Sequence, residues 1–229
     1  SPLKSFWGIN KKTEIKLNKK GIITIGDLAH YPHRYLKKDF GILGTDMHLH
    51  ANGIDQSKIR EKSKINNPAI CKSQILMRDY QFNETKIVMQ ELIEDVACRL
   101  RERKQLARTI HFSFGYTEGG GIHKQHTLTD ATNLEQDIFK VVNDYANQLC
   151  DKHALYRTLS VSLTQFINEE NRQLNLFIDE YKRQRDENLA KTIDTLQRKY
   201  GKGIVSKAIS YTASGTKHNR LGLMAGHKM

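Results

Sequence analysis

The chain has 229 residues, enough to bury one large hydrophobic core or two modest ones, and we expect two. Lysine and arginine outnumber aspartate and glutamate by 37 to 25, and the net charge of +12 favours a polyanionic partner, nucleic acid ahead of an anionic membrane surface. No apolar run approaches the ~20 residues that a membrane span needs, and the amino end lacks a signal-peptide pattern, so a cytoplasmic protein is predicted.

Cysteines and histidines indicate no metal site. The three cysteines are widely spaced and suit neither a disulfide framework nor a zinc knuckle. Ten histidines are present, and none of their pairs has the HExxH spacing of a zinc enzyme. We therefore assign no metal and no cofactor to this chain.

The amino-terminal segment predicts two short helices. A tight turn at Gly8-Ile9-Asn10 leads into a helix that stops at Gly21, and a second helix starts near Thr24. The arrangement resembles the helix-hairpin-helix unit of DNA-binding repair proteins. In that family the hairpin N–H groups and the following helix N-terminus hold a phosphate without reading sequence.

The helix-hairpin-helix resemblance assigns the first DNA contacts. The second hairpin glycine of that family is Asn10 here, and we expect Asn10 to adopt the left-handed backbone region, which Asn enters more easily than most residues. The alternative is a plain helical turn on a basic surface. The predicted contacts are Gly8, Ile9, Asn10, Lys11, Lys12 and Thr13.

Domain boundaries follow from composition. Residues 1–60 are expected to form a small all-helical domain with a thin core. A polar run before Pro68 predicts a linker at residues 61–71. An α+β domain over residues 72–168 and a helical carboxyl-terminal extension over residues 169–229 complete the predicted organisation.

The central domain predicts the element order β-α-β-β-α-β. Strands are expected over residues 74–80, 107–116, 123–128 and 155–164, from alternation of apolar and polar side chains. In the last strand we expect Leu155, Leu159, Val161 and Leu163 to face inward, and Tyr156, Thr158, Ser160, Ser162 and Thr164 to face outward.

Two helices are predicted between these strands. The first, over residues 84–103, carries an apolar residue at every fourth position: Val88, Leu92, Val96 and Leu100. The second is expected to begin with Thr132 as N-cap and Glu135 three residues later, and to bury Leu134, Ile138, Val141, Tyr145 and Leu149. With right-handed crossovers both helices cover one face of a four-stranded sheet and leave the other open.

The open sheet face is either merely solvated or a binding surface. Small hydroxyl side chains on it and cations beside the strands favour a phosphate backbone as ligand. The predicted DNA contacts of this domain are Lys72, Ser73, Arg78, Arg108, Thr109, His111, Ser113, Lys124, Arg157, Ser160 and Ser162.

An ordered series of motifs resembles a Y-family translesion DNA polymerase, and most closely its UmuC-like branch. The series is Phe-Trp-Gly-Ile-Asn-Lys-Lys-Thr at residues 6–13, Gly-Ile-Ile-Thr-Ile-Gly-Asp-Leu-Ala at 21–29, Phe-Gly-Ile-Leu-Gly at 40–44 and Gln-Ile-Leu-Met-Arg-Asp-Tyr at 74–80. The resemblance implies a thumb domain that grips the minor groove and a little finger whose open sheet lies along the major groove.

The same resemblance implies what this chain would not do alone. Family members transfer phosphoryl groups with acidic palm residues that bind two Mg²⁺ ions. No such motif precedes the thumb-like segment, so we expect a carboxyl-terminal fragment that is inactive by itself.

The segment after the last predicted strand looks like the pentapeptide by which bacterial polymerases bind the sliding clamp. It reads Gln173-Leu174-Asn175-Leu176-Phe177, and the resemblance assigns clamp contacts to Gln173, Leu174, Leu176 and Phe177. An extended segment can place two apolar side chains in a pocket while Gln173 hydrogen-bonds at its edge. The alternative is an apolar staple back onto the domain.

The carboxyl-terminal extension predicts one charged helix and a loose end. Leu189, Ile193 and Leu196 recur at helical spacing within residues 180–200, a narrow stripe that suits docking on another surface. Residues 212–229 are expected to be poorly ordered alone. The resemblance raises a UmuD-like protein or a recombinase as partners, and the residues themselves assign neither.

The sequence therefore predicts the DNA-binding and clamp-binding part of an error-prone polymerase in translesion synthesis and SOS-type repair. One rival is a non-enzymatic helix-hairpin-helix DNA-binding repair factor. Another is a basic scaffold that binds only protein.

Overall fold

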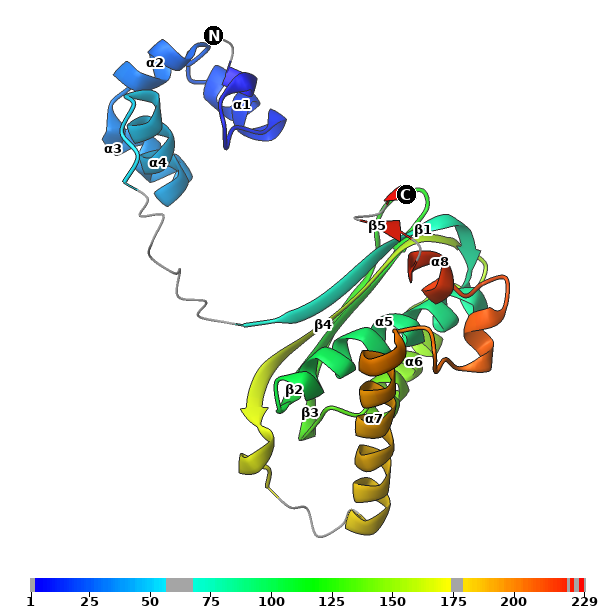
Figure 1. Cartoon of the computed structure of the whole chain (residues 1–229). Helices are drawn as coiled ribbons and strands as arrows, with labels where there is room; N and C mark the ends of the chain where they lie inside the picture. The colour runs from blue at the N-terminus through cyan, green and yellow to red at the C-terminus, as the bar shows by residue number, and fades with distance from the viewer. Residues whose placement is uncertain (1–2, 57–67, 174–178, 222, 225–226, 229) are drawn as a thin grey trace. The chain divides into compact units, whose positions relative to one another are not determined.

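The computed structural model describes residues 3–56, 68–173, 179–221, 223–224 and 227–228. The chain forms two compact units, residues 1–64 and 65–229 (Figure 1). Three of the residues assigned to clamp binding, Leu174, Leu176 and Phe177, lie outside the described residues. Within the described part of the chain, no helix is both long and apolar enough to cross a membrane.

The first unit is built from short helices, as expected. They are a 3₁₀ turn at Leu3–Ser5 and α1 (Lys11–Asn18), α2 (Ile25–His30), α3 (His33–Phe40) and α4 (Ile42–Ala51). The core is thin and consists of Leu3, Ile9, Leu17, Ile22, Leu28, Leu36 and Met47.

Local sequence explains how these helices begin and meet. Thr24 is the N-cap of α2, and its side chain and that of Asp27 form a reciprocal capping box. Gly41 ends α3 at a φ of 62°, a conformation that favours glycine. A Cβ at Gly44 would lie 2.1 Å from the carbonyl oxygen of Leu36, so this glycine permits the close approach of α4 to α3.

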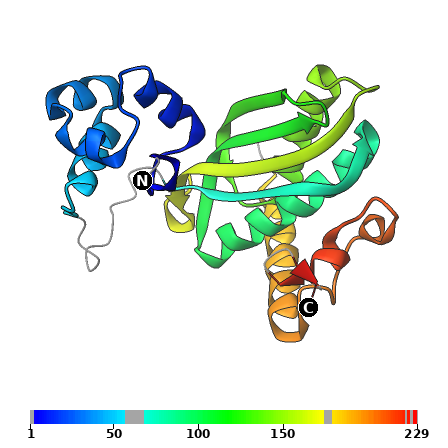
Figure 2. The ribbon, with the colours of Figure 1, turned by 90° about the horizontal axis from the view of Figure 1, so that it is seen from above.

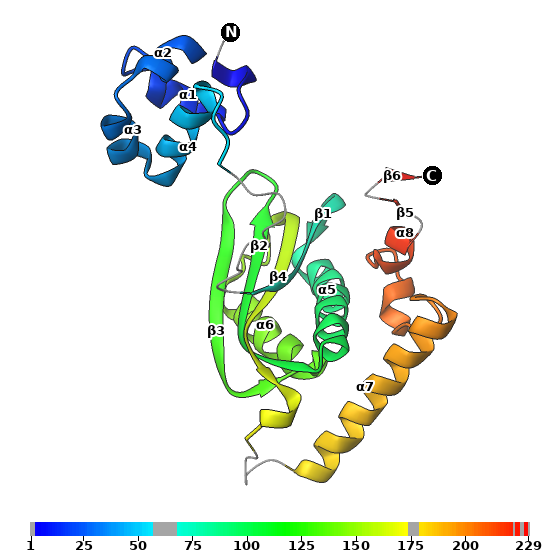
Figure 3. The ribbon, with the colours of Figure 1, turned by 60° about the vertical axis from the view of Figure 1, so that its left-hand side comes forward.

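The second unit contains a four-stranded antiparallel sheet in the order β1-β4-β2-β3. Figure 2 shows the sheet from above. The strands are β1 (Ile70–Gln81), β2 (Gln105–Tyr116), β3 (Gly121–Thr132) and β4 (Leu155–Asn168), each longer than its pattern predicted. The helices α5 (Phe82–Glu102) and α6 (Glu135–Leu149) lie together on one side of the sheet (Figure 3).

The helix α5 buries the apolar face that periodicity predicts, whereas α6 differs: Val141 and Tyr145 are half-buried, and Val142 and Ala146 are buried in their place. Every member of the predicted α5 stripe is fully buried. In α6, Ile138 is buried as expected, while Leu149 is exposed. Thr132 is not the N-cap, which is Leu134. Instead the Thr132 hydroxyl accepts from the Leu134 N–H at 3.1 Å and donates to Asp137 at 2.6 Å.

The first residues of β4 face the opposite way from the prediction. Tyr156 is fully buried, whereas Leu155 is 46% exposed. The register shows the reason: Thr158 pairs with Gly115 and Tyr156 with Tyr116, so Arg157 is an extra residue in β4. A Cβ at Gly115 would lie 2.1 Å from the Thr158 hydroxyl oxygen, so glycine is required opposite this bulge.

The carboxyl-terminal extension packs on the helix-covered side of the second unit. Its elements are a 3₁₀ turn at Glu169–Asn171, α7 (Glu180–Tyr200), a 3₁₀ turn at Ala208–Tyr211, α8 (Lys217–Leu221) and the strands β5 (Leu223–Met224) and β6 (His227–Lys228). The helix α7 docks mainly through polar side chains, and of the predicted apolar stripe only Ile193 faces the rest of the unit. Arg101 of α5 bridges Asp194 of α7 at 2.6 Å and Glu135 of α6 at 3.3 Å.

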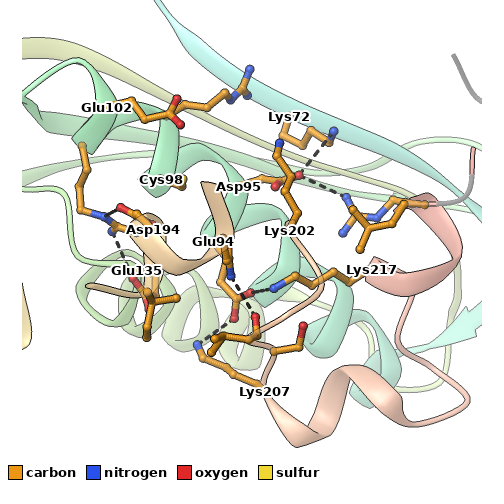
Figure 4. A pocket seen from close by; sticks show the side chains of 18 residues that line it. Lys72, Glu94, Asp95, Cys98, Glu102, Glu135, Asp194, Lys202, Lys207 and Lys217 are labelled. Carbon is orange, nitrogen blue, oxygen red and sulfur yellow. Dashed lines mark hydrogen bonds and ion pairs between the residues drawn. The ribbon is translucent and has the colours of Figure 1, made fainter. Parts of the chain in front are cut away.

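Residues 207–220, which we term the carboxyl-terminal clasp, are fastened to α5, so the expectation of a poorly ordered end is wrong for its described part. The carboxylate of Glu91, 1% exposed, accepts from the backbone N–H of Thr216 at 3.1 Å and pairs with Arg220 at 3.2 Å. Glu94 pairs with both Lys207 and Lys217 at 3.1 Å. Figure 4 shows the ion pairs of Glu94 with Lys207 and Lys217 beside a cavity of about 420 Å³ between α5, α7 and the clasp.

Candidate nucleic-acid interface

The open face of the sheet carries a ladder of small polar side chains on its two central strands. Ser113 of β2 lies opposite Ser160 of β4, and His111 lies opposite Ser162. The two serine hydroxyls are 2.6 Å apart, and His111 Nε2 lies 3.1 Å from the Thr164 hydroxyl. These groups hydrogen-bond to one another along the two central strands.

A shallow hollow of about 360 Å³ lies on this face. Its polar lining includes His111, Ser113, His123, Gln125, Ser160 and Ser162. Such side chains offer hydrogen bonds to phosphate and sugar oxygens without fixing a base sequence. The geometry therefore suits a nucleic-acid backbone better than a small apolar ligand.

Thr109 lies on the same side as this ladder but is not available. It is 1% exposed, and its hydroxyl donates to Gln165 Oε1 at 2.8 Å and lies 3.1 Å from the Thr127 hydroxyl. Gln165 itself has a φ of 55°, rare for a residue with a Cβ. The Thr109 side chain therefore stabilises the open face through its hydrogen bonds and offers no group to a ligand.

The predicted cationic rim is only partly on the open face. Lys72 lies across from Val161, a core residue, and its ammonium is 3.5 Å from Asp95 on the helix side. Lys124 lies across from Phe112, and its ammonium is 5.9 Å from the Tyr145 ring of α6. Both lysines therefore belong to the helix-covered side of their edge strands.

The arginines of the predicted rim differ in pairing. Arg78 donates to Glu84 at 3.0 Å, and Arg157 lies 3.5 Å from Asp79. The hydrogen bond from Arg78 is the main reason that the pKa of Glu84 falls to about 2. Arg108 is exposed and donates to the carbonyl of Leu128 at 3.2 Å. Arg108 also lines a pocket with Asp130 of β3 and Glu180 of α7, and it is not among the residues that line the hollow of the open face.

Sequence reasoning assigned Ser73 of β1 to the open face but missed the apolar side chains beside it. Ser73 pairs with Ser160, so its neighbours Cys71 and Ile75 on the same side also belong to the open face. Ile75 is 72% exposed and Met77 is 52% exposed. Both apolar residues lie inside the strand predicted over residues 74–80, but the prediction assigned neither of them to the open face.

In the first unit the start of α1 has a different geometry from the one expected. Asn10 has a φ of −87° and is extended, so the left-handed assignment is wrong. Its side chain is the N-cap and accepts from the Thr13 N–H at 2.9 Å. Gly8, at a φ of 87°, makes the turn instead.

The turn before α1 also positions its neighbours. Ile9 is buried in the core of the first unit, and Lys11 and Lys12 are exposed on the first helical turn. This arrangement places two ammonium groups and a helix N-terminus close together, a combination that favours an anion.

Comparison with solved structures supports the fold. The chain is similar to a chimera of the Y-family DNA polymerases Dbh and Dpo4, with a TM-score of 0.54 and 16% identity over 73% of this chain and 48% of that one. The fold is therefore that of the carboxyl-terminal part of a Y-family polymerase.

Comparison with sequences identifies the family. Residues 68–176 match the impB/mucB/samB family C-terminal domain. The chain is 38% identical to the UV-damage repair protein UvrX of Bacillus subtilis, over 99% of this chain and 55% of the relative. It is 32% identical to DNA polymerase IV of Moorella thermoacetica, over 93% of this chain and 53% of the relative. Residues 68–176 are therefore a C-terminal domain of the impB/mucB/samB family, and the chain spans about half the length of these relatives.

Proposed function

We propose that this chain is the DNA-gripping and clamp-binding carboxyl-terminal part of an error-prone Y-family DNA polymerase in translesion synthesis and SOS-type repair. The observation that carries the proposal is the open sheet face with its ladder of His111, Ser113, Ser160 and Ser162. Family membership and relatives named as polymerases and repair proteins support it.

The proposal assigns DNA contacts to both units of this chain and the reaction to another domain. The first unit offers the α1 N-terminus with Lys11 and Lys12 to a phosphate, and the second offers its open face to the duplex backbone. Neither surface reads base edges, so the selectivity is for primer-template structure. We place the Mg²⁺-dependent phosphoryl transfer in a palm domain of the full-length protein.

The DNA part is tested with a charge placed on the open face. Ser162→Glu adds a carboxylate to the ladder and is expected to weaken binding of a fluorescein-labelled primer-template duplex more than tenfold. The control variant Gln148→Glu adds the same charge at an exposed position of α6, on the side of the sheet opposite to the proposed DNA face. Salt screens that charge over about 8–10 Å. Equal affinities for the two variants would refute the proposed face.

The clamp part is tested by calorimetric titration with a bacterial sliding clamp. Saturable binding is expected for the intact chain, and its loss is expected when Gln173, Leu176 and Phe177 are all changed to alanine. Absence of binding by the intact chain would contradict the assignment and would favour the apolar-staple alternative.

The non-enzymatic repair factor is the second candidate, and the names of the relatives do not favour it. Polymerase activity of the full-length protein on a primer-template with Mg²⁺ separates the two. Extension of the primer supports the polymerase, and DNA binding without extension supports the repair factor.

A further inference from the structure

The outward side of α7 is an apolar stripe that nothing in the described chain covers. Tyr181, Leu189, Leu196 and Tyr200 fall within about 100° of the helix circumference. Tyr181 is 84% exposed, and Leu189 and Tyr200 are each 59% exposed. Leu189 and Leu196 belong to the predicted docking stripe, whereas its third member, Ile193, is half-buried and lines the cavity beside α5.

The opposite side of α7 is already used. Arg183, Glu187, Ala190 and Asp194 are buried against the rest of the unit, roughly 160° around the helix from the stripe. Arg183 donates to the carbonyl of Ala131 at 3.0 Å. Figure 3 shows α7 farther from the sheet than α5. Because α7 is held by its polar side, its apolar side faces away from the unit's core.

The charges beside the stripe have one sign. Lys182, Arg185 and Lys199 lie on the same side of the helix and are exposed. Among the described residues none of these three makes an ion pair with an acid. The nearby carboxylates are engaged elsewhere, since Asp186 accepts from Gln136 at 2.7 Å and Glu180 pairs with Arg172 at 2.8 Å.

We propose that this side of α7 docks an acidic amphipathic helix of another protein. The exposed run from Tyr181 to Tyr200 is roughly 28 Å long, which matches a partner helix of similar length. Two leucines seven residues apart fit helix-to-helix packing, and the unpaired cations fit glutamates that flank an apolar seam. Aliphatic side chains at the centre favour this occupant over single-stranded DNA, which stacks its bases on aromatic rings.

The test uses a synthetic 21-residue helical peptide with leucines at seam positions and glutamates beside them, labelled for fluorescence anisotropy. The intact chain is expected to bind it saturably. The double variant Leu189→Ser/Leu196→Ser is expected to lose more than tenfold in affinity. Leu155→Ser, which changes a similarly exposed leucine on β4, is the matched control and is expected to bind as the intact chain does.

A second peptide with lysine in place of every glutamate isolates the charge argument and is expected not to bind. Circular dichroism checks that the variants keep the fold. Equal binding of both peptides, or unchanged binding by the double variant, overturns the proposal. A concentration-dependent dimer that the double variant abolishes would also overturn it and would assign the stripe to a second copy of the chain. A loss of single-stranded DNA binding in that variant would overturn it as well and would assign the stripe to nucleic acid.

Discussion

Asn10 stabilises the start of α1 with its side chain, in an ordinary backbone conformation. An extended residue whose carboxamide accepts from the Thr13 N–H satisfies a donor that the helix leaves without an intrahelical partner. This distinction has a measurable consequence, because a left-handed residue and an N-cap respond differently to glycine.

Asn10→Ala is expected to reduce the stability of the first unit by about 1 kcal/mol, whereas Asn10→Gly should cost only a few tenths of a kcal/mol and Asn10→Asp should retain the cap. Hydrogen exchange of the amides of residues 11–18 measures the effect. A glycine variant more stable than the native chain would contradict the N-cap geometry.

Glu84 couples the end of β1 to acid stability. The hydrogen bond from Arg78 holds the folded-state pKa of Glu84 at about 2, below its ordinary value of 4.5. A depressed pKa stabilises the fold above pH 4.5, and this contribution is lost as the pH falls toward 2. Thermal denaturation of Glu84→Gln should therefore vary less with pH across this interval than that of the native chain. An identical pH profile would count against the interaction.

At the scale of elements, the periodic parts of the fold are the predictable ones. The α5 stripe and the strand alternation report burial directly, so their positions follow from local pattern. The bulge at Arg157 gives no signal in the sequence pattern, because Leu155 and Tyr156 are both apolar and either can face the core. The docking of α7 gives no signal in the pattern either, since it depends on Arg101 and Asp194, two charged residues that are far apart in the sequence.

The candidate site shows the same division. The ladder of His111, Ser113, Ser160 and Ser162 comes from alternation and was predictable. The side of the sheet on which Lys72 and Lys124 lie was not predictable, because a cation beside a strand can also turn toward the helix side. The burial of Thr109 depends on Gln165, whose positive φ has no sequence signal.

The α7 docking predicts the reactivity of Cys98. Burial, with Asp194 close by, raises the pKa of the Cys98 thiol to about 12. Asp194→Ala leaves Arg101 buried without its main partner, which costs about 3–5 kcal/mol and should loosen α7. Alkylation of Cys98 by iodoacetamide should then accelerate, while exposed Cys71 reacts as before. Unchanged protection of Cys98 would mean that this ion pair does not hold the helix.

At the scale of the whole molecule, a net charge of +12 coexists with a row of acids on α5. The chain keeps these acids away from the open sheet face. Carboxylates of α5 pair with the clasp on the helix side, and the open sheet face has no carboxylate in its ladder. Such a separation lets a polyanion approach one side of the second unit without meeting the acids of the other.

The affinity for duplex DNA should fall steeply with salt. The logarithm of the association constant is expected to decrease linearly with the logarithm of salt concentration, at about −0.9 per phosphate neutralised, and Lys11→Gln should make that slope shallower by about one such unit. Anisotropy titrations over a range of sodium chloride concentrations measure both slopes. A flat response of the native chain would refute the electrostatic grip.

Salt is expected to act on the clasp as well as on DNA binding. The carboxylates of Glu91 and Glu94 form ion pairs with Lys207, Lys217 and Arg220. Added salt screens such pairs, most strongly where they are exposed, as it screens a contact between a cation and a phosphate. A salt titration of DNA binding therefore also weakens the attachment of the chain's own carboxyl-terminal end.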